Sequence, residues 1–230
     1  MARTSAVVVD ATANPEQDGV LAPFDDAFRS ELDRLFAVRR DVRTFRADTV
    51  PDDHIAACLA TFETAPSVGL SQPWRLVEVK NPEARAAVQA NFREANAIAA
   101  NQYVGAQHDT YTSLKLAGLE TAPVQLAVFC EPDPSQGHGL GRQTQPAMVH
   151  ASAVCGIMQV WLAARARGIG LGWVSILDVP QLKRDLDIQL SWDLVAYLCL
   201  GYPAEPSEVP ELERAGWEHR DRERTVRLIR

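Results

Sequence analysis

Residues 39–45 read Arg-Arg-Asp-Val-Arg-Thr-Phe and follow directly on a predicted helix that spans Asp25 to about Arg40. Three arginines within five residues suit a phosphate dianion, because the guanidinium is a planar fork of donors that stays charged when partly buried. Basic residues at a helix C-terminus also complement its dipole, so a solvated helix end remains the alternative. A carboxylate among them, Asp41, weakens an anion site and needs either a structural or a chemical reason.

A second informative stretch, residues 65–74, reads Ala-Pro-Ser-Val-Gly-Leu-Ser-Gln-Pro-Trp. Two prolines and a glycine predict an irregular loop between a helix and a strand. Small residues there allow backbone amides to approach a flat ligand closely. The alternative is an ordinary helix-to-strand connection with Trp74 in the core.

Hydrophobic periodicity predicts the elements around these two stretches. In the first helix, Phe28, Leu32, Leu35 and Phe36 form one apolar stripe. The strongest helix, 149–167, is apolar almost all round at its start, which is typical of a buried central helix. Further helices are predicted from Pro51 to before Pro66, over 82–103 and from Pro180, with strands over 74–79, 123–130, 171–176 and 194–200.

The composition of the 230-residue chain is that of an average globular protein, with 47% hydrophobic and 23% charged residues. Its net charge of −7 disfavours binding to nucleic acids or to anionic membranes, and no apolar run has the roughly 20 residues that span a bilayer. We therefore expect one domain over 23–220, with a flexible arm over 1–22 and a tail over 221–230. No secretion signal is evident and the four cysteines, 58, 130, 155 and 199, lie in apolar stretches, which predicts a cytoplasmic protein with small, reduced core thiols.

Several familiar site motifs are missing from the sequence. The glycines of residues 168–172 do not have GxGxxG spacing and follow a predicted helix, whereas that dinucleotide fingerprint opens one. The five histidines form no HxxxH or HExxH pattern, so no metal site is predicted. Neither a P-loop nor a GxSxG nucleophile motif occurs.

The two stretches together resemble the flavin-dependent nitroreductase superfamily. RRDVRTF at 39–45 is similar to its R-x-[S/D]-x-[R/K]-x-F motif, and APSVGLSQPW at 65–74 is similar to its second motif. Asp41, where ordinary nitroreductases usually have Ser, together with GLGWVSI at 170–176 resembles more narrowly the 5,6-dimethylbenzimidazole synthase branch, also called BluB. The resemblance runs from about Phe24 to Arg220.

This resemblance implies an α+β, nitroreductase-like fold, with a mixed central β-sheet flanked by helices, in an intertwined homodimer with FMN at the subunit interface. It implies that Arg39, Arg40 and Arg43 hold the phosphate and ribityl end, with Val42 beside them. The remaining implied flavin contacts are Pro66, Ser67, Val68 and Gly69 from the other subunit, Ser113, Leu114, Val174 and Ser175, and a second phosphate cation, Arg220.

The branch implies a reaction in which reduced FMN is the substrate and O2 the co-substrate. Flavin is fragmented to 5,6-dimethylbenzimidazole, the lower ligand of cobalamin, and erythrose 4-phosphate. Asp41 then acts as acid or base, with a structural arginine partner as its alternative role, and Ser175 donates a hydrogen bond near the flavin N5, or else caps a turn. No metal is required, and a separate flavin reductase supplies reduced FMN.

Two other functions remain open from the sequence. The first is an NAD(P)H-dependent FMN nitroreductase or dehalogenase, which shares the phosphate arginines but has no evident use for Asp41. The second is a non-catalytic flavin-binding protein, which binds oxidised FMN without turnover.

Overall fold

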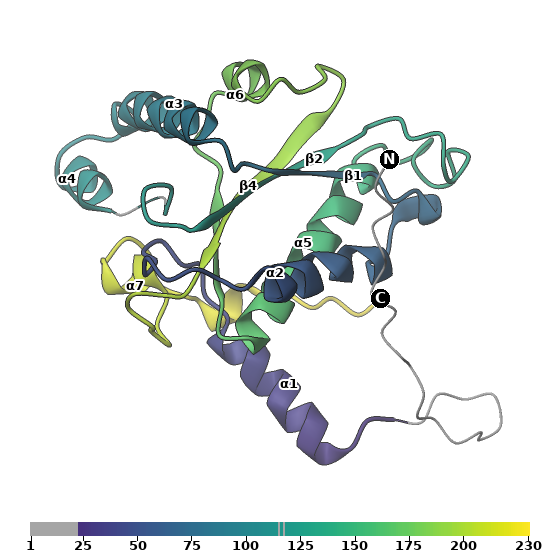
Figure 1. Cartoon of the computed structure of the whole chain (residues 1–230). Helices are drawn as coiled ribbons and strands as arrows, with labels where there is room; N and C mark the ends of the chain where they lie inside the picture. Colours follow the sequence, from purple (N-terminus) through teal and green to yellow (C-terminus); the bar gives the residue numbers. More distant parts are fainter. Residues whose placement is uncertain (1–22, 115, 117) are drawn as a thin grey trace. The chain divides into compact units, whose positions relative to one another are not determined.

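The computed structural model of the chain describes residues 23–114, 116 and 118–230 (Figure 1). The predicted arm over 1–22 lies outside these residues. The chain divides into two compact units between Arg34 and Leu35, and the second holds every element discussed below except the start of the first helix. The described elements are α1 (Asp26–Val38), α2 (Asp52–Leu59), η1 (Ala60–Thr64), η2 (Val68–Leu70), β1 (Trp74–Glu78), α3 (Pro82–Ala100), α4 (Ala106–Ser113), β2 (Val124–Cys130), α5 (Met148–Ala166), β3 (Gly170–Val174), α6 (Val179–Asp185), β4 (Asp193–Gly201), α7 (Glu211–Arg214) and η3 (Arg222–Arg224).

The four described strands form one sheet in the order β1-β2-β4-β3, and every neighbouring pair is antiparallel. Among the described residues, parallel pairing occurs at a single bridge, which joins Asp41 to Leu171 of β3. The predicted α+β class is confirmed, and the mixed character of the sheet rests on this one bridge. The strands predicted over 74–79, 123–130, 171–176 and 194–200 are present with shifts of one or two residues at their ends.

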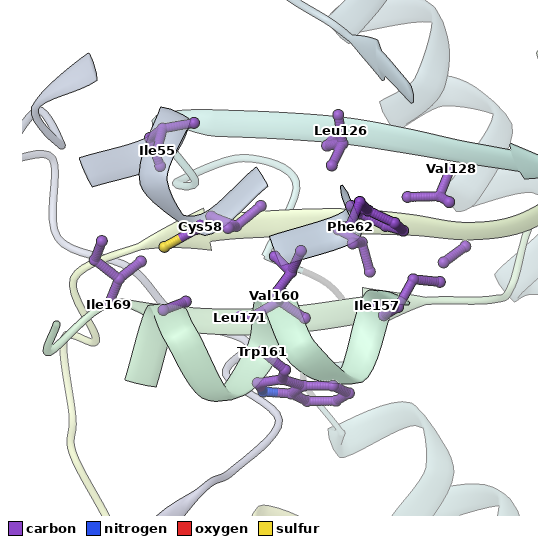
Figure 2. Close-up of a cluster of buried hydrophobic side chains, with 14 of the residues drawn as sticks. Ile55, Cys58, Phe62, Leu126, Val128, Ile157, Val160, Trp161, Ile169 and Leu171 are labelled. Atoms are coloured by element: carbon purple, nitrogen blue, oxygen red, sulfur yellow. The ribbon is translucent and has the colours of Figure 1, made fainter. Parts of the chain in front are cut away.

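Both faces of the sheet are covered, because the central strands carry apolar side chains at odd and even positions alike. Leu126 and Val128 face one hydrophobic cluster, which is built with α2, η1 and α5 (Figure 2). Ala127 and Phe129 face a second cluster on the opposite side, to which α3 and α6 contribute Val88 and Leu182. Two clusters on opposite faces make a three-layer core of helices, sheet and helices.

The central helix α5 is buried on one side and exposed on the other. Ile157, Val160 and Ala164 are fully buried against the sheet. Val154 and Met158 are 41% and 42% exposed, although both are apolar. The expectation of a buried central helix therefore holds for one face only. Successive exposed positions, Met148, Val154, Cys155 and Met158, lie within about a third of a turn of one another, since each residue advances by 100°.

The apolar stripe predicted in the first helix is also exposed. No residue of α1 is buried in the described structure, and Phe28 and Phe36 are 45% and 52% exposed. The helix forms as predicted but ends at Val38, ahead of the arginines.

All four cysteines are described and none is in a disulfide. Cys58, Cys130 and Cys199 are buried, as predicted, and burial raises the pKa of Cys130 to about 11 and that of Cys199 to about 12. The expectation that Cys155 is a packing residue is wrong, because it lies on the exposed face of α5. No helix in the described part of the chain has the length and apolarity needed to cross a membrane.

Inside the sheet, the Tyr197 hydroxyl donates a 2.7 Å hydrogen bond to Gln125 Oε1, while Gln125 Nε2 donates to the Leu119 carbonyl. Tyr197→Phe leaves a buried amide oxygen without its donor, so we expect the free energy of unfolding to fall by about 1–3 kcal/mol. Urea denaturation measures it. Tyr202→Phe is the control, since that half-buried ring keeps its contact with Arg46; an equal loss in both variants would contradict the assignment.

Candidate functional site

The arginine-rich segment lies along the edge strand β3 and is fixed there by its own acidic residue. The Val42 amide donates a 3.0 Å hydrogen bond to the Leu171 carbonyl. Asp41 Oδ1 accepts a 2.9 Å bond from the Trp173 amide, and Asp41 Oδ2 accepts a 2.8 Å bond from Arg43 Nε. Asp41 therefore has the structural role that was its alternative interpretation, while its side chain remains 31% exposed and reachable.

Gly172 allows this close approach. A Cβ at residue 172 would lie under 3.0 Å from the Val42 carbonyl oxygen, a backbone atom that cannot move without the segment. At Gly170 a Cβ would instead meet the Val42 and Pro203 side chains, at 2.8 and 3.0 Å. Two of the glycines that fail as a dinucleotide fingerprint, Gly170 and Gly172, thus leave the space in which residues 41–43 approach the strand.

The first two arginines are held by α5 and by the chain's C-terminal part. The Arg39 guanidinium stacks on the Trp161 ring, 4.5 Å from its centroid, and Trp161 Nε1 donates to the Arg40 carbonyl. The Arg40 side chain donates to the carbonyls of Glu208 and Arg39. Each guanidinium is thereby held in a defined place before any ligand arrives.

The charge of a third cation, Arg220, acts on both arginines from about 180 positions further along the chain. Burial lowers the pKa of Arg39, and the positive charge of Arg220 lowers it further, while Asp41 opposes the shift. Burial also lowers the pKa of Arg40, followed by the charges of Arg220 and Arg39. Like charges brought together at a cost in free energy are relieved by a bound anion. The three side chains therefore fit a phosphate group.

A pocket of about 200 Å³ lies beside this cluster. Of the predicted site residues, Arg40, Asp41, Val42, Arg43, Ser113 and Leu114 line it. Sequence reasoning missed Trp161 and Arg165 from α5 and Arg214 from α7, which also line it. No local signal marks these three, because they come to the pocket only through the packing of α5 and the return of the C-terminal segment.

The Pro66–Gly69 loop is well fixed but lies elsewhere. The Val68 amide donates to Ser152 Oγ of α5 (2.9 Å), and Ser67 Oγ accepts from the Gln72 amide (3.1 Å). Leu70 and Gln72 have φ values of 55° and 43°, a strained region for residues other than glycine. None of the described residues that line the pocket comes from 66–69, so one chain does not bring this loop to the arginines.

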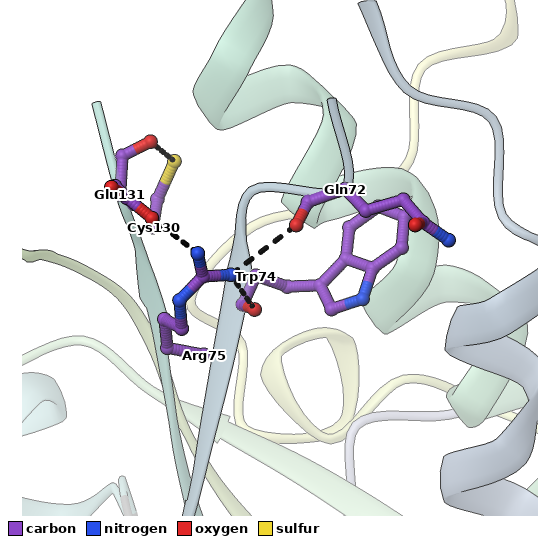
Figure 3. Close-up of polar contacts among 5 residues, drawn as sticks. All are labelled: Gln72, Trp74, Arg75, Cys130 and Glu131. Atoms are coloured by element: carbon purple, nitrogen blue, oxygen red, sulfur yellow. Dashed lines mark hydrogen bonds and ion pairs between the residues drawn. The ribbon is translucent and has the colours of Figure 1, made fainter. Parts of the chain in front are cut away.

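Arg75 fixes the exit of the same loop into β1 (Figure 3). One of its nitrogens donates to the carbonyls of Gln72 and Trp74, at 3.3 and 2.9 Å, and another forms an ion pair with Glu131. The guanidinium therefore ties the loop to the start of the edge strand β1 and to Glu131, the residue that follows β2.

Comparison with known proteins identifies the relationship. The sequence profile of the nitroreductase family matches residues 37–202, which include the segment fixed on β3 and the loop on α5. The chain belongs to the nitroreductase family. It is 49% identical to 5,6-dimethylbenzimidazole synthase of Rhodospirillum rubrum over 197 residues, which are 86% of this chain and 93% of that protein.

Solved nitroreductase-like structures agree on the fold. Iodotyrosine deiodinase bound to FMN and 3-iodo-L-tyrosine aligns with a TM-score of 0.64 at 21% identity, covering 76% of this chain and 91% of that one. A nitroreductase with bound FMN from Desulfitobacterium hafniense aligns with a TM-score of 0.62 at 18% identity, covering 86% and 98%. At these identities the likeness establishes the nitroreductase fold alone.

Two further predicted site residues of this nitroreductase-family protein lie at the end of β3 and directly after it. Val174 is 3% exposed and its side chain belongs to the core, so only its backbone can face a ligand. Ser175 is exposed and lies two residues beyond Trp173, whose amide binds Asp41. Two strand residues span about 7 Å, which puts Asp41 and Ser175 at one end of the same strand. No group of three or more potential metal ligands occurs among the described residues.

We expect Gly172→Ala to destabilise this nitroreductase-family protein by about 1–3 kcal/mol. The added methyl group meets the backbone and must displace residues 41–43. Gly170→Ala is the matched comparison, and we expect a smaller loss because the ends of side chains can yield. The free energy of unfolding from denaturant titration measures both. The opposite order of losses would contradict the proposed fixing of the segment on β3.

Proposed function

We propose that this nitroreductase-family enzyme is a 5,6-dimethylbenzimidazole synthase, which uses O2 to fragment reduced FMN into 5,6-dimethylbenzimidazole and erythrose 4-phosphate. The benzimidazole is the lower ligand of cobalamin. The observation that carries the proposal is a carboxylate, Asp41, held in the middle of a cationic cluster at a pocket. Similarity to the named synthase of Rhodospirillum rubrum supports it.

The donor set suits FMN as the bound molecule. Arg39, Arg40 and Arg220 offer their charges to the phosphate, and Arg43 lies at the ribityl side. Ser113 and Leu114, on another wall of the pocket, then lie along the ring edge. Bound reduced flavin supplies the electrons that activate O2; the protein's part is to hold the flavin and to move protons.

Asp41 is the group placed to move those protons. Its two oxygens accept one hydrogen bond each from Trp173 and Arg43, and this leaves further lone pairs of the carboxylate for a substrate proton. Ser175, at the end of the same strand, offers a hydroxyl toward the flavin N5. A serine in place of Asp41 has neither the charge nor the reach to hold the segment and to exchange a proton.

The site is proposed to be completed by a second copy of the chain. A pocket of about 200 Å³ is below the roughly 300–1,000 Å³ of sites that enclose a cofactor-sized ligand. The Pro66–Gly69 loop, which does not reach the arginines of its own chain, is then supplied by the partner. Exposed apolar side chains gather on α5 and on the loops that contact its start, as expected of a surface covered by another subunit: Leu70, Leu140, Met148, Val154 and Met158.

We propose that the completed site has no platform for a nicotinamide ring beside the flavin. We therefore propose that a separate flavin reductase supplies reduced FMN, which this protein binds as a substrate.

The reaction is tested by mixing the protein with photoreduced FMN under nitrogen and then admitting air. We expect 5,6-dimethylbenzimidazole in the chromatogram, in an amount that rises with the enzyme supplied and is absent without O2. Intact reoxidised FMN, together with turnover of NADPH and a nitroarene, would instead establish an ordinary nitroreductase. Intact FMN with no turnover of either kind would establish a flavin-binding protein.

Two substitutions of Asp41 separate its chemical role from its structural one. Asp41→Asn keeps an oxygen for the Trp173 amide but loses the acceptor for Arg43 Nε, so we expect the unfolding temperature to fall modestly while FMN still binds. Without its exchangeable proton, the variant should make benzimidazole at least about 100-fold more slowly. Asp41→Ser should lose both the reaction and stability. An undiminished benzimidazole yield from both variants would exclude the acid or base role.

The second copy is tested with Val154→Asp, which places a charge on the exposed face of α5. We expect the mass in light scattering to fall from that of a dimer to 25.3 kDa, with loss of FMN binding. Leu190→Asp is the control, because Leu190 is 78% exposed and belongs to the turn before β4 instead of to α5. A wild-type monomer that produces benzimidazole would contradict the shared site.

A further inference from the structure

We propose that Trp217 is a positioning residue that joins α4 to the C-terminal segment and thereby places Arg220 at the phosphate site. The inference rests on the proposed function, since it concerns how the same site binds FMN. It is carried by an aromatic cluster, Tyr103, Tyr111 and Trp217, which lies outside the residues assigned to the site so far.

The backbone at Trp217 is fixed by the end of α7. Gly216, with φ of 71°, donates its amide to the Glu213 carbonyl, and the Trp217 amide donates to the Leu212 carbonyl at 2.9 Å. These two bonds form the Schellman motif that ends many helices, with glycine at the left-handed position. The chain therefore leaves α7 in one defined direction, and Trp217 is the residue that directly follows the glycine turn.

Trp217 meets two tyrosines, Tyr111 of α4 and Tyr103 of the segment before α4. Its ring lies 5.3 Å from that of Tyr103, edge-on at 86°, and 6.0 Å from that of Tyr111. The tyrosine rings stack on each other at 4.7 Å, and the Tyr111 hydroxyl donates to Asn96 Oδ1 of α3. Rings at these separations attract one another. Figure 1 shows α4 and α7 on the same side of the molecule.

The joined segments both line the pocket. Ser113, the last residue of α4, and Leu114 form part of one wall, and Glu211, Arg214 and Ala215 of the α7 region form part of another. Trp217 thus connects the two segments that carry these wall residues, which are about 100 positions apart in the sequence.

Arg220 follows Trp217 by three residues and is tied back to the same helix. Its amide donates a 2.7 Å hydrogen bond to Glu213 Oε1. Its charge acts on Arg39 and Arg40, which lowers the pKa of each. These two arginines repel Arg220, so contacts elsewhere must hold it in place. Besides the bond to Glu213, Trp217 provides a second contact that fixes this segment, since its ring packs against the two tyrosines.

The experiment compares binding of oxidised FMN with binding of riboflavin, which lacks the phosphate. Flavin fluorescence quenching gives the Kd of each ligand for wild type, Trp217→Ala, Trp217→Phe, Arg220→Ala and the double variant. We expect Trp217→Ala to weaken FMN binding about tenfold or more, the scale of a lost charge-assisted contact, while riboflavin binding is unchanged. Trp217→Phe should restore most of the preference for FMN, and the double variant should lose little more than Arg220→Ala alone.

Trp192→Ala is the matched control, because that half-buried indole stacks on Arg75 and is not among the residues that line the pocket. It should keep the wild-type preference for FMN. Three results would each overturn the inference alone. Trp217→Ala could weaken the binding of FMN and riboflavin equally, or it could keep the wild-type preference for FMN. The double variant could also show the sum of the two single losses in FMN affinity. A wild-type chain that binds riboflavin as tightly as FMN would overturn the phosphate site and the inference with it.

Discussion

The hydrogen bonds of one carboxylate hold the site in place. Asp41 accepts from the Trp173 amide on β3 and from Arg43 in its own segment, and so connects the arginine-rich stretch to the sheet. The edge strand leaves its amides unpaired on that side, and the carboxylate satisfies one of them. Glycine at residue 172 is the steric condition for the arrangement, since any side chain there meets the Val42 carbonyl. The same acid that weakens an anion site in isolation is what positions the arginines around it.

Repulsion among the three arginine side chains raises the free energy of the folded chain. Arg39 is stacked on Trp161, Arg40 is bonded to the carbonyl of Glu208, and Arg220 is tied to Glu213. Three separate parts of the chain therefore hold these arginines, Arg39 and Arg40 by their guanidinium groups and Arg220 by its backbone amide. An arrangement prepared in advance in this way spends less free energy on ordering when the anion binds.

Exposed apolar side chains on α1 and α5 explain why the fold looks incomplete as a single chain. A central helix usually has its apolar residues buried all round, but here Val154 and Met158 face outward. The loop with the strained residues Leu70 and Gln72 is fixed on the same helix, and its residues 66–69 do not line the pocket beside the arginines. A second copy that covers this surface would bury the side chains and bring the loop to a flavin at once.

The sequence by itself determined most of the secondary structure, the α+β class and the family, because the apolar periodicity and the two motifs are local patterns. It did not reveal α4 or α7. Of the arginines that line the pocket it predicted Arg40 and Arg43, which share one motif, but not Arg165 or Arg214. Only the tertiary structure decided that Asp41 is an anchor as well as a candidate proton carrier, that Cys155 is exposed, that Trp161 stacks on Arg39, and that Trp217 packs against two tyrosines. These facts depend on contacts between residues up to about 130 positions apart, and no local pattern of side chains records which distant surface the folded chain will bring to them.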